Sequence, residues 1–211
     1  MKNLKTFLLL FNLAFLSISA QEAATNKVTM SIDSNSSSLK WIGEKITTSQ
    51  HYGSLKFLSG DLSFCNDKVV ENPNDFSKLI NDRGLICSGN FTVDMTSLLV
   101  EDLTGSSKER LESHLKSDDF FSVNKHEKAY LSIENSKVID SGFLVNGSLT
   151  IKDIIHPIEF RLVRAPGGFV ANLVFDRSKY NVRYNSGSFF ENLGDKLILD
   201  DIKLTANLYF Q

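Results

Sequence analysis

The sequence predicts an all-β fold, an antiparallel eight-stranded β-barrel with one short helix. Apolar residues alternate with polar ones along most of the chain after residue 28, which is the pattern of half-buried strands. Turn signals recur at intervals of roughly ten residues, so consecutive strands are antiparallel neighbours of a barrel or sandwich. Nearly every predicted strand has only one apolar face. A closed barrel buries such faces and removes the sheet edges, and we therefore prefer it.

Residues 1–20 have the pattern of a signal peptide. Lys2 and Lys5 give the start of the chain a positive charge, an apolar run extends from Phe7 to Leu16, and Ala20 is a small residue suited to cleavage. A membrane anchor is the alternative, but spanning a bilayer takes about 20 apolar residues. We therefore expect one domain, residues 21–211, in a periplasmic or secreted location and without stable membrane insertion.

The charge balance excludes some partners. Cleavage after residue 20 leaves 21 basic and 25 acidic residues, a net charge of −4 with no basic cluster. This balance argues against nucleic acid and against anionic membrane surfaces. A homodimer is compatible with the sequence, but nothing in the sequence specifies one.

The first strands lie between residues 28 and 64. The inward parity switches near Ser59 and Gly60, where a glycine bulge would bend a strand around a barrel corner. The apolar members of the alternation are Val28, Met30, Ile32, Leu39, Trp41, Ile46, Leu55, Phe57, Leu62 and Phe64.

A long loop is expected over residues 66–84, with a turn signal at 72–75. Cys65 and Cys87 flank this loop. In an oxidising compartment they would form a disulfide that closes a loop of about 23 residues and stabilises the fold by roughly 3 kcal/mol. Two buried free thiols are the alternative.

A short helix is expected at 107–116. Leu111 and Leu115 lie four residues apart on one of its faces, and Ser106 with Glu109 has the spacing of a capping box. Such a short helix is not stable alone in water, so it must lie on an apolar surface.

Between the long loop and the helix, Phe91, Val93 and Met95 alternate with polar residues and predict another strand, and the alternation resumes after the helix. Further strands are expected from about residue 129 to 175, and the final strand at about 197–209. A long loop at 185–194 carries the apolar pair Phe189 and Phe190.

Motifs for catalysis and metal binding do not occur. The four histidines, His51, His114, His126 and His156, do not pair at the spacing of metal ligands. There is no nucleophile elbow and no glycine-rich phosphate loop. We therefore expect no catalytic residue, no metal and no cofactor.

Several segments together resemble the YceI-like family. They are HLKSDDFFSVNKHEKAYLSI at 114–133, GSLTIKD at 147–153 and HPIEFRL at 156–162, with further matches at 41–45, 51–53, 59–62, 91–97 and 193–195. The resemblance covers nearly all of the chain after about residue 28. It implies a secreted or periplasmic, lipocalin-like barrel that binds polyisoprenoids or related lipids. The 66–84 loop is longer than the family pattern.

The aromatic supply fits such a ligand. Thirteen phenylalanines follow residue 20, more bulk than a tightly filled small barrel needs. A lipid chain gains about 0.8 kcal/mol per buried methylene, so long chains would bind well and short ones poorly. We expect the ligand-binding residues to be His51 near the barrel mouth and the apolar set Phe57, Phe91, Met95, Leu115, Phe120, Phe121, Phe143, Phe160, Phe175 and Phe189.

Three functions follow from this pattern. The first is an exported protein that sequesters or transports an isoprenoid, a quinone tail or a fatty-acid-like chain. The second is a barrel enzyme in which His51 or an interior carboxylate acts on a lipid-like substrate. The third is a stress or interaction protein with a filled core, and it predicts no cavity.

Overall fold

The computed structural model describes residues 26–47, 49–66 and 84–211. The expected signal peptide and the turn at 72–75 lie outside these residues. The described elements, in chain order, are β1 (Asn26–Ser31), β2 (Ser38–Lys45), β3 (Gln50–Asn66), β4 (Leu85–Val100), α2 (Gly105–Lys116), β5 (Lys128–Ile139), β6 (Gly142–Ile151), β7 (Ile154–Ala165), β8 (Gly168–Asp176), the one-turn 3-10 helices η1 (Arg177–Tyr180) and η2 (Gly194–Lys196), and β9 (Ile198–Tyr209).

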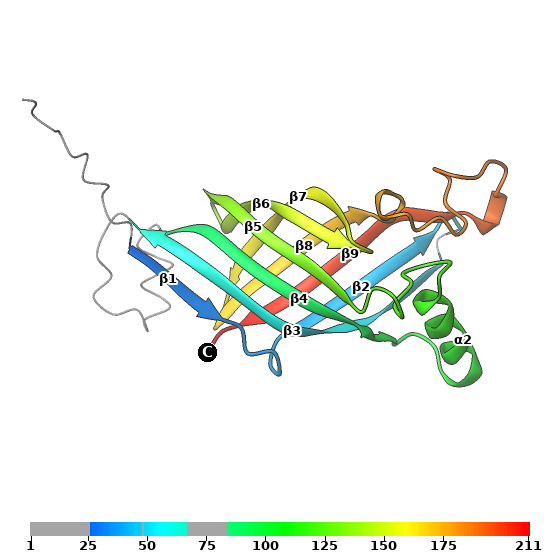
Figure 1. Ribbon diagram of the computed structural model, residues 1–211, viewed down its shortest axis with the longest axis horizontal. Coiled ribbons are helices and arrows are strands. Elements are labelled where there is room, and N and C mark those ends of the chain that lie inside the picture. Colours follow the sequence, from blue (N-terminus) through cyan, green and yellow to red (C-terminus); the bar gives the residue numbers. More distant parts are fainter. Residues whose placement is uncertain (1–25, 48, 67–83) are drawn as a thin grey trace, which may run out of the picture.

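The strands close into a barrel. The order in the sheet is β1-β3-β2-β9-β8-β7-β6-β5-β4, and β3 also pairs with β4. Strands β2 to β9 therefore form a closed ring of eight antiparallel strands, and β1 is one extra strand beside β3 (Figure 1). The predicted eight-stranded barrel is confirmed.

The long strand β3 bends around the barrel at the expected place. Its pairing with β4 shifts register between Phe57 and Ser59, so Leu58 is an extra residue whose side chain is exposed. A Cβ atom at Gly60 would overlap the ring of Phe91. The bulge predicted near Ser59 and Gly60 is confirmed, and it lets one strand contact β2 at one end and β1 at the other.

Helix α2 lies at one end of the barrel and buries Leu115 (Figure 1). The predicted capping box is wrong. The helix begins at Gly105, so Thr104 is the N-cap, without a side-chain cap bond, and Ser106 already lies in the first turn. Instead, the Glu112 carboxylate accepts a hydrogen bond from the backbone N–H of Val100 at 2.8 Å and ties the helix to β4.

The opposite end of the barrel is solid. Phe64, Phe143 and Phe169 are at most 1% exposed, and their ring centroids lie 6.0 to 6.5 Å apart. Cys65 and Cys87 form a disulfide between β3 and β4 at this end, with their Cα atoms 5.8 Å apart. We call this end the aromatic plug, defined by the three phenylalanines.

Within the described ranges, no helix combines the length and the apolar character that crossing a bilayer requires. Over these same ranges, no three His, Cys, Asp or Glu side chains come together as ligands for a metal ion.

Candidate functional site

The barrel interior between the aromatic plug and α2 is a cavity. About 180 Å³ of it is open to the centre of a water-sized sphere, and one water needs roughly 10–15 Å³ on that measure. The lining is almost entirely apolar. It consists of Leu39, Trp41, Gly43, Glu44, Lys45, His51, Leu55, Phe57, Leu62, Phe91, Val93, Met95, Leu98, Leu111, His114, Leu115, Phe120, Phe121, Ala129, Tyr130, Leu131, Ile133, Leu149, Ile151, Phe160, Leu162, Ala171, Leu173, Phe175, Ile198, Ile202, Leu204, Ala206 and Leu208.

Small side chains create the hollow. Across four neighbouring strands, Leu39 pairs with Ala206, Ala206 with Ala171, and Ala171 with Leu162. Two alanines thus lie side by side in the middle of this wall. Ala129 lines the cavity on the side formed by β4 and β5. Phenylalanines at other points of the wall do not fill the space that these methyl groups leave.

The cavity reaches the surface at the α2 end. His51 belongs to the lining and is 36% exposed, whereas the aromatic plug is sealed from solvent. The polar lining residues Glu44 and Lys45 come from the end of β2, next to His51 in the sheet register. The mouth therefore carries the polar groups, and the interior is apolar.

His51 is held in place at the mouth by Asp102. The Nδ1 atom of His51 lies 2.7 Å from one carboxylate oxygen, and the other oxygen accepts the backbone N–H of Tyr52 at 3.1 Å. Burial works to raise the pKa of Asp102, but the hydrogen bonds from His51 and Tyr52 outweigh it and hold that pKa below its usual value. Because Nδ1 is engaged, Nε2 is the ring nitrogen left for a ligand.

The comparisons with known proteins decide the family. The model of the YceI-like domain matches residues 30–210. The chain belongs to the YceI-like family. No curated protein sequence matches this chain significantly.

Solved structures resemble this YceI-like domain in fold. BcnA from Burkholderia cenocepacia has a TM-score of 0.57 and 16% identity, covering 84% of this chain and 98% of that protein. A polyisoprenoid binding domain from Saccharophagus degradans, implicated in plant cell wall breakdown, has a TM-score of 0.50 and 12% identity, covering 88% of this chain and 99% of that domain. A YceI protein from Campylobacter jejuni has a TM-score of 0.44 and 18% identity, covering 60% of this chain and 73% of that protein.

The structure brings most of the expected site residues of the YceI-like domain to the cavity. The expected residues that line it are His51, Phe57, Phe91, Met95, Leu115, Phe120, Phe121, Phe160 and Phe175. The alanines and Trp41 also line the cavity, but they are not among the ligand-binding residues expected from the sequence. The alternation marks Ala171 and Ala206 as inward-facing, but their pairing depends on register, which the sequence does not state.

Two expected residues lie elsewhere. Phe143 lies near the start of β6, at the closed end of the barrel. The ring of Phe143 packs against Phe64 and Phe169, so this residue belongs to the aromatic plug. Phe189 is 40% exposed on the loop after η1. The backbone N–H of Phe189 bonds to the Ser186 carbonyl, and its ring lies 4.8 Å from the Arg183 guanidinium, outside the cavity.

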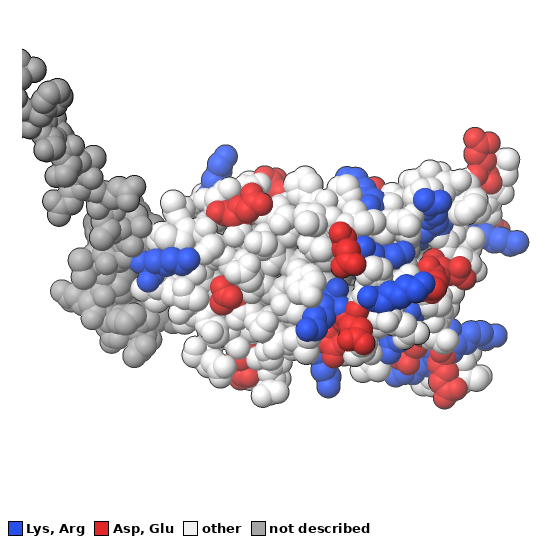
Figure 2. Space-filling view, in the orientation of Figure 1, with Lys and Arg blue, Asp and Glu red and all other residues white. Residues whose placement is uncertain are grey.

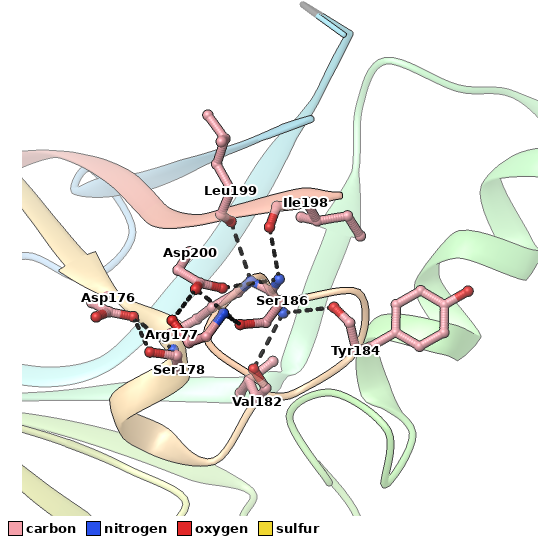
Figure 3. Close-up of polar contacts among 10 residues, drawn as sticks. Asp176, Arg177, Ser178, Val182, Tyr184, Ser186, Ile198, Leu199 and Asp200 are labelled. Atoms are coloured by element: carbon pink, nitrogen blue, oxygen red, sulfur yellow. Dashed lines mark hydrogen bonds and ion pairs between the residues drawn. The ribbon is translucent and has the colours of Figure 1, made fainter. Parts of the chain in front are cut away.

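A buried arginine anchors the loop beside the mouth. Arg177 is fully buried, and its guanidinium ion-pairs with Asp200 at 3.2 Å. Asp200 also accepts a hydrogen bond from the hydroxyl of Ser186 (Figure 3). The hydroxyl of Ser188 donates a second hydrogen bond to Asp200. The guanidinium donates further hydrogen bonds of 3.0 to 3.2 Å to the carbonyls of Val182, Tyr184, Ile198 and Leu199. Because all its polar groups are engaged inside the protein, we assign Arg177 a structural role.

Charged side chains of both signs gather over the half of the barrel nearer α2 on the face seen in Figure 2, and the other half of that face carries few. Lys203 with Glu44 and Lys40 with Glu101 are examples of pairs of opposite sign. The mixture leaves no large surface of a single sign on this face.

Proposed function

We propose that this YceI-like protein is an exported lipid carrier, periplasmic or secreted, that holds one long-chain ligand in its cavity. The ligand class is an isoprenoid, a quinone tail or a fatty-acid-like chain, and the role is sequestration or transport without chemical change. The observation that carries the proposal is the hollow apolar interior, closed by the aromatic plug and open at α2. The related domain from Saccharophagus degradans, described as polyisoprenoid binding, supports the ligand class.

The size of the cavity agrees with a chain-like ligand. Its volume of about 180 Å³ holds on the order of a dozen water-sized groups. Burying a dozen methylenes gains roughly 10 kcal/mol, against association costs of about 4–15 kcal/mol. Affinity should therefore rise steeply with chain length, and short chains should bind weakly.

The hypothesis of a stress or interaction protein with a filled core predicted no cavity, and the hollow interior argues against it. The enzyme alternative keeps one supporting observation, the His51–Asp102 pair. A histidine of the cavity lining that is held through Nδ1 by a carboxylate has the arrangement of a general base.

Native mass spectrometry of the exported protein tests the proposal. We expect a co-purified long-chain lipid, and after its removal the uptake of saturated and isoprenoid chains with affinity that rises with length. The mass of the bound ligand should stay unchanged on incubation. Absence of both native lipid and uptake would contradict the carrier proposal, and a change of ligand mass that His51→Ala abolishes would favour the enzyme.

A further inference from the structure

One face of α2 looks over the cavity mouth. Ser107, Arg110, Leu111 and His114 lie at spacings of three, four and seven residues, so they share that face. Together with His51, Leu103 and Tyr184 they line a shallow vestibule. The vestibule is continuous with the cavity, because Leu111, His114 and His51 line both.

The vestibule carries a cation whose charge is not neutralised locally. Arg110 is exposed and makes no ion pair or hydrogen bond within the described part of the chain. Glu109, next to Arg110 in the chain, is exposed and does not line the vestibule, and the other two carboxylates near this face are engaged elsewhere. Asp102 bonds to His51, and Glu112 bonds to the backbone of Val100 and lies 3.7 Å from Lys108.

The lining residues of the vestibule are otherwise uncharged or histidine. No aspartate or glutamate is among them, as far as the described residues show. An anion placed there would meet the Arg110 guanidinium without facing a lining carboxylate. A guanidinium suits carboxylate and phosphate oxygens because it donates two parallel hydrogen bonds.

A second observation points to a ligand atom at the inner edge of the vestibule. The His114 ring is fixed by edge-on contacts with Tyr184 at 4.3 Å and Phe120 at 5.7 Å. Its Nε2 atom is buried and has no hydrogen-bond partner among the described residues. Buried polar nitrogens are normally paired, so this atom is a natural partner for an oxygen of a bound head group.

We propose that the vestibule binds the anionic head group of the chain held in the cavity. Arg110 pairs with the anion, and the Ser107 hydroxyl and the Nε2–H of His114 donate hydrogen bonds to the same oxygens. This inference rests on the proposed lipid-carrier function and narrows its ligand class. The preferred ligand is a long chain that ends in a carboxylate or a phosphate, and an uncharged alcohol or hydrocarbon of equal length binds more weakly.

The test compares matched chains with different heads. Delipidated protein is titrated with a fatty acid, a fatty alcohol and an alkyl phosphate of equal chain length, each displacing a fluorescent apolar probe. We expect the acid or the phosphate to bind about tenfold more tightly than the alcohol, the range of a charge-assisted hydrogen bond. Whichever of the two anionic chains binds more tightly shows whether the natural ligand ends in a carboxylate or in a phosphate. Added salt should reduce the preference.

Two variants on α2 separate this proposal from a general charge effect. Arg110→Gln should lower the affinity for the anionic chain to that for the alcohol. Lys108→Gln removes the same charge from the same helix, outside the vestibule, and should keep the tenfold preference. Equal affinities for acid, phosphate and alcohol in the unsubstituted protein would overturn the head-group site while the carrier function stands. Failure of the alcohol and of both anionic chains to bind would instead overturn the carrier function.

Discussion

The two halves of the barrel use the same kinds of residue and reach opposite results. At the closed end Phe64, Phe143 and Phe169 meet at one level and fill the cross-section. Nearer α2, the paired residues Ala171 and Ala206 face the interior, and the phenylalanines stand around a hollow. The number of aromatic residues therefore does not decide whether a barrel is solid. A barrel is solid at a given level along its axis only where large side chains meet at that level, and it is hollow where their neighbours are small.

The two ends are also held together by different forces. The closed end combines apolar packing with the Cys65–Cys87 disulfide. The mouth end relies on buried polar groups, Arg177 with its ion pair to Asp200, and Tyr180, which is 2% exposed and packs against Phe175. Packing responds mainly to changes of volume, whereas buried polar groups also respond to pH.

Filling the hollow half gives the largest expected effect. Ala206→Trp places a large ring in the cavity, and we expect it to abolish uptake of long-chain ligands. Thermal stability should change little, since the ring enters existing space. Val174→Trp is the matched control on the outer face of β8, where the native side chain is 49% exposed, and should bind lipid normally. Unchanged uptake by Ala206→Trp would show that the ligand lies elsewhere.

Truncating one phenylalanine in each half measures the difference in packing. Phe143→Ala in the aromatic plug should lower the free energy of unfolding by about 3–5 kcal/mol. Phe160→Ala in the cavity wall should cost less, about 1–3 kcal/mol, because that ring already lacks partner atoms on its cavity side. Urea unfolding of the delipidated proteins measures both values. Equal losses would mean that the cavity half is packed as tightly as the plug.

Alkaline titration tests the polar end, with a smaller expected effect. Burial, together with the charge of Asp176, raises the pKa of Tyr180 from 10.0 to about 12. The folded state thus favours the neutral phenol, and this stability is fully present below pH 10 and is lost as the pH rises to about 12. A shift of this size corresponds to roughly 2–3 kcal/mol.

The matched variant for this titration is Tyr180→Phe, which keeps the ring and removes the ionisable hydroxyl. Its free energy of unfolding, measured by urea at a series of pH values, should fall less between pH 10 and 12 than that of the unsubstituted protein. Parallel curves for the two proteins would show that Tyr180 does not carry the alkaline loss.

Local patterns in the sequence predicted most of the architecture. Alternation located the strands, and the change of parity near Ser59 located the bulge in β3. The capping box was wrong because the helix begins at Gly105, so that Thr104 is the N-cap and Ser106 already lies in the first turn. A shift of two residues at a helix end is decided by the surroundings of that end, and the sequence pattern does not contain it.

By itself, the sequence determined the strands, their single apolar face and hence a closed barrel, because alternation is a property of neighbouring residues. Only the tertiary structure decided where the barrel is hollow. Whether Phe143 fills a plug while Phe160 borders a cavity depends on which residues lie opposite at the same level. That level is set by the register between strands distant in sequence, such as Ala171 against Ala206. The mouth was decided in the same way, since His51 meets Asp102 through the register of β3 against β4, which places Gly53 opposite Val100.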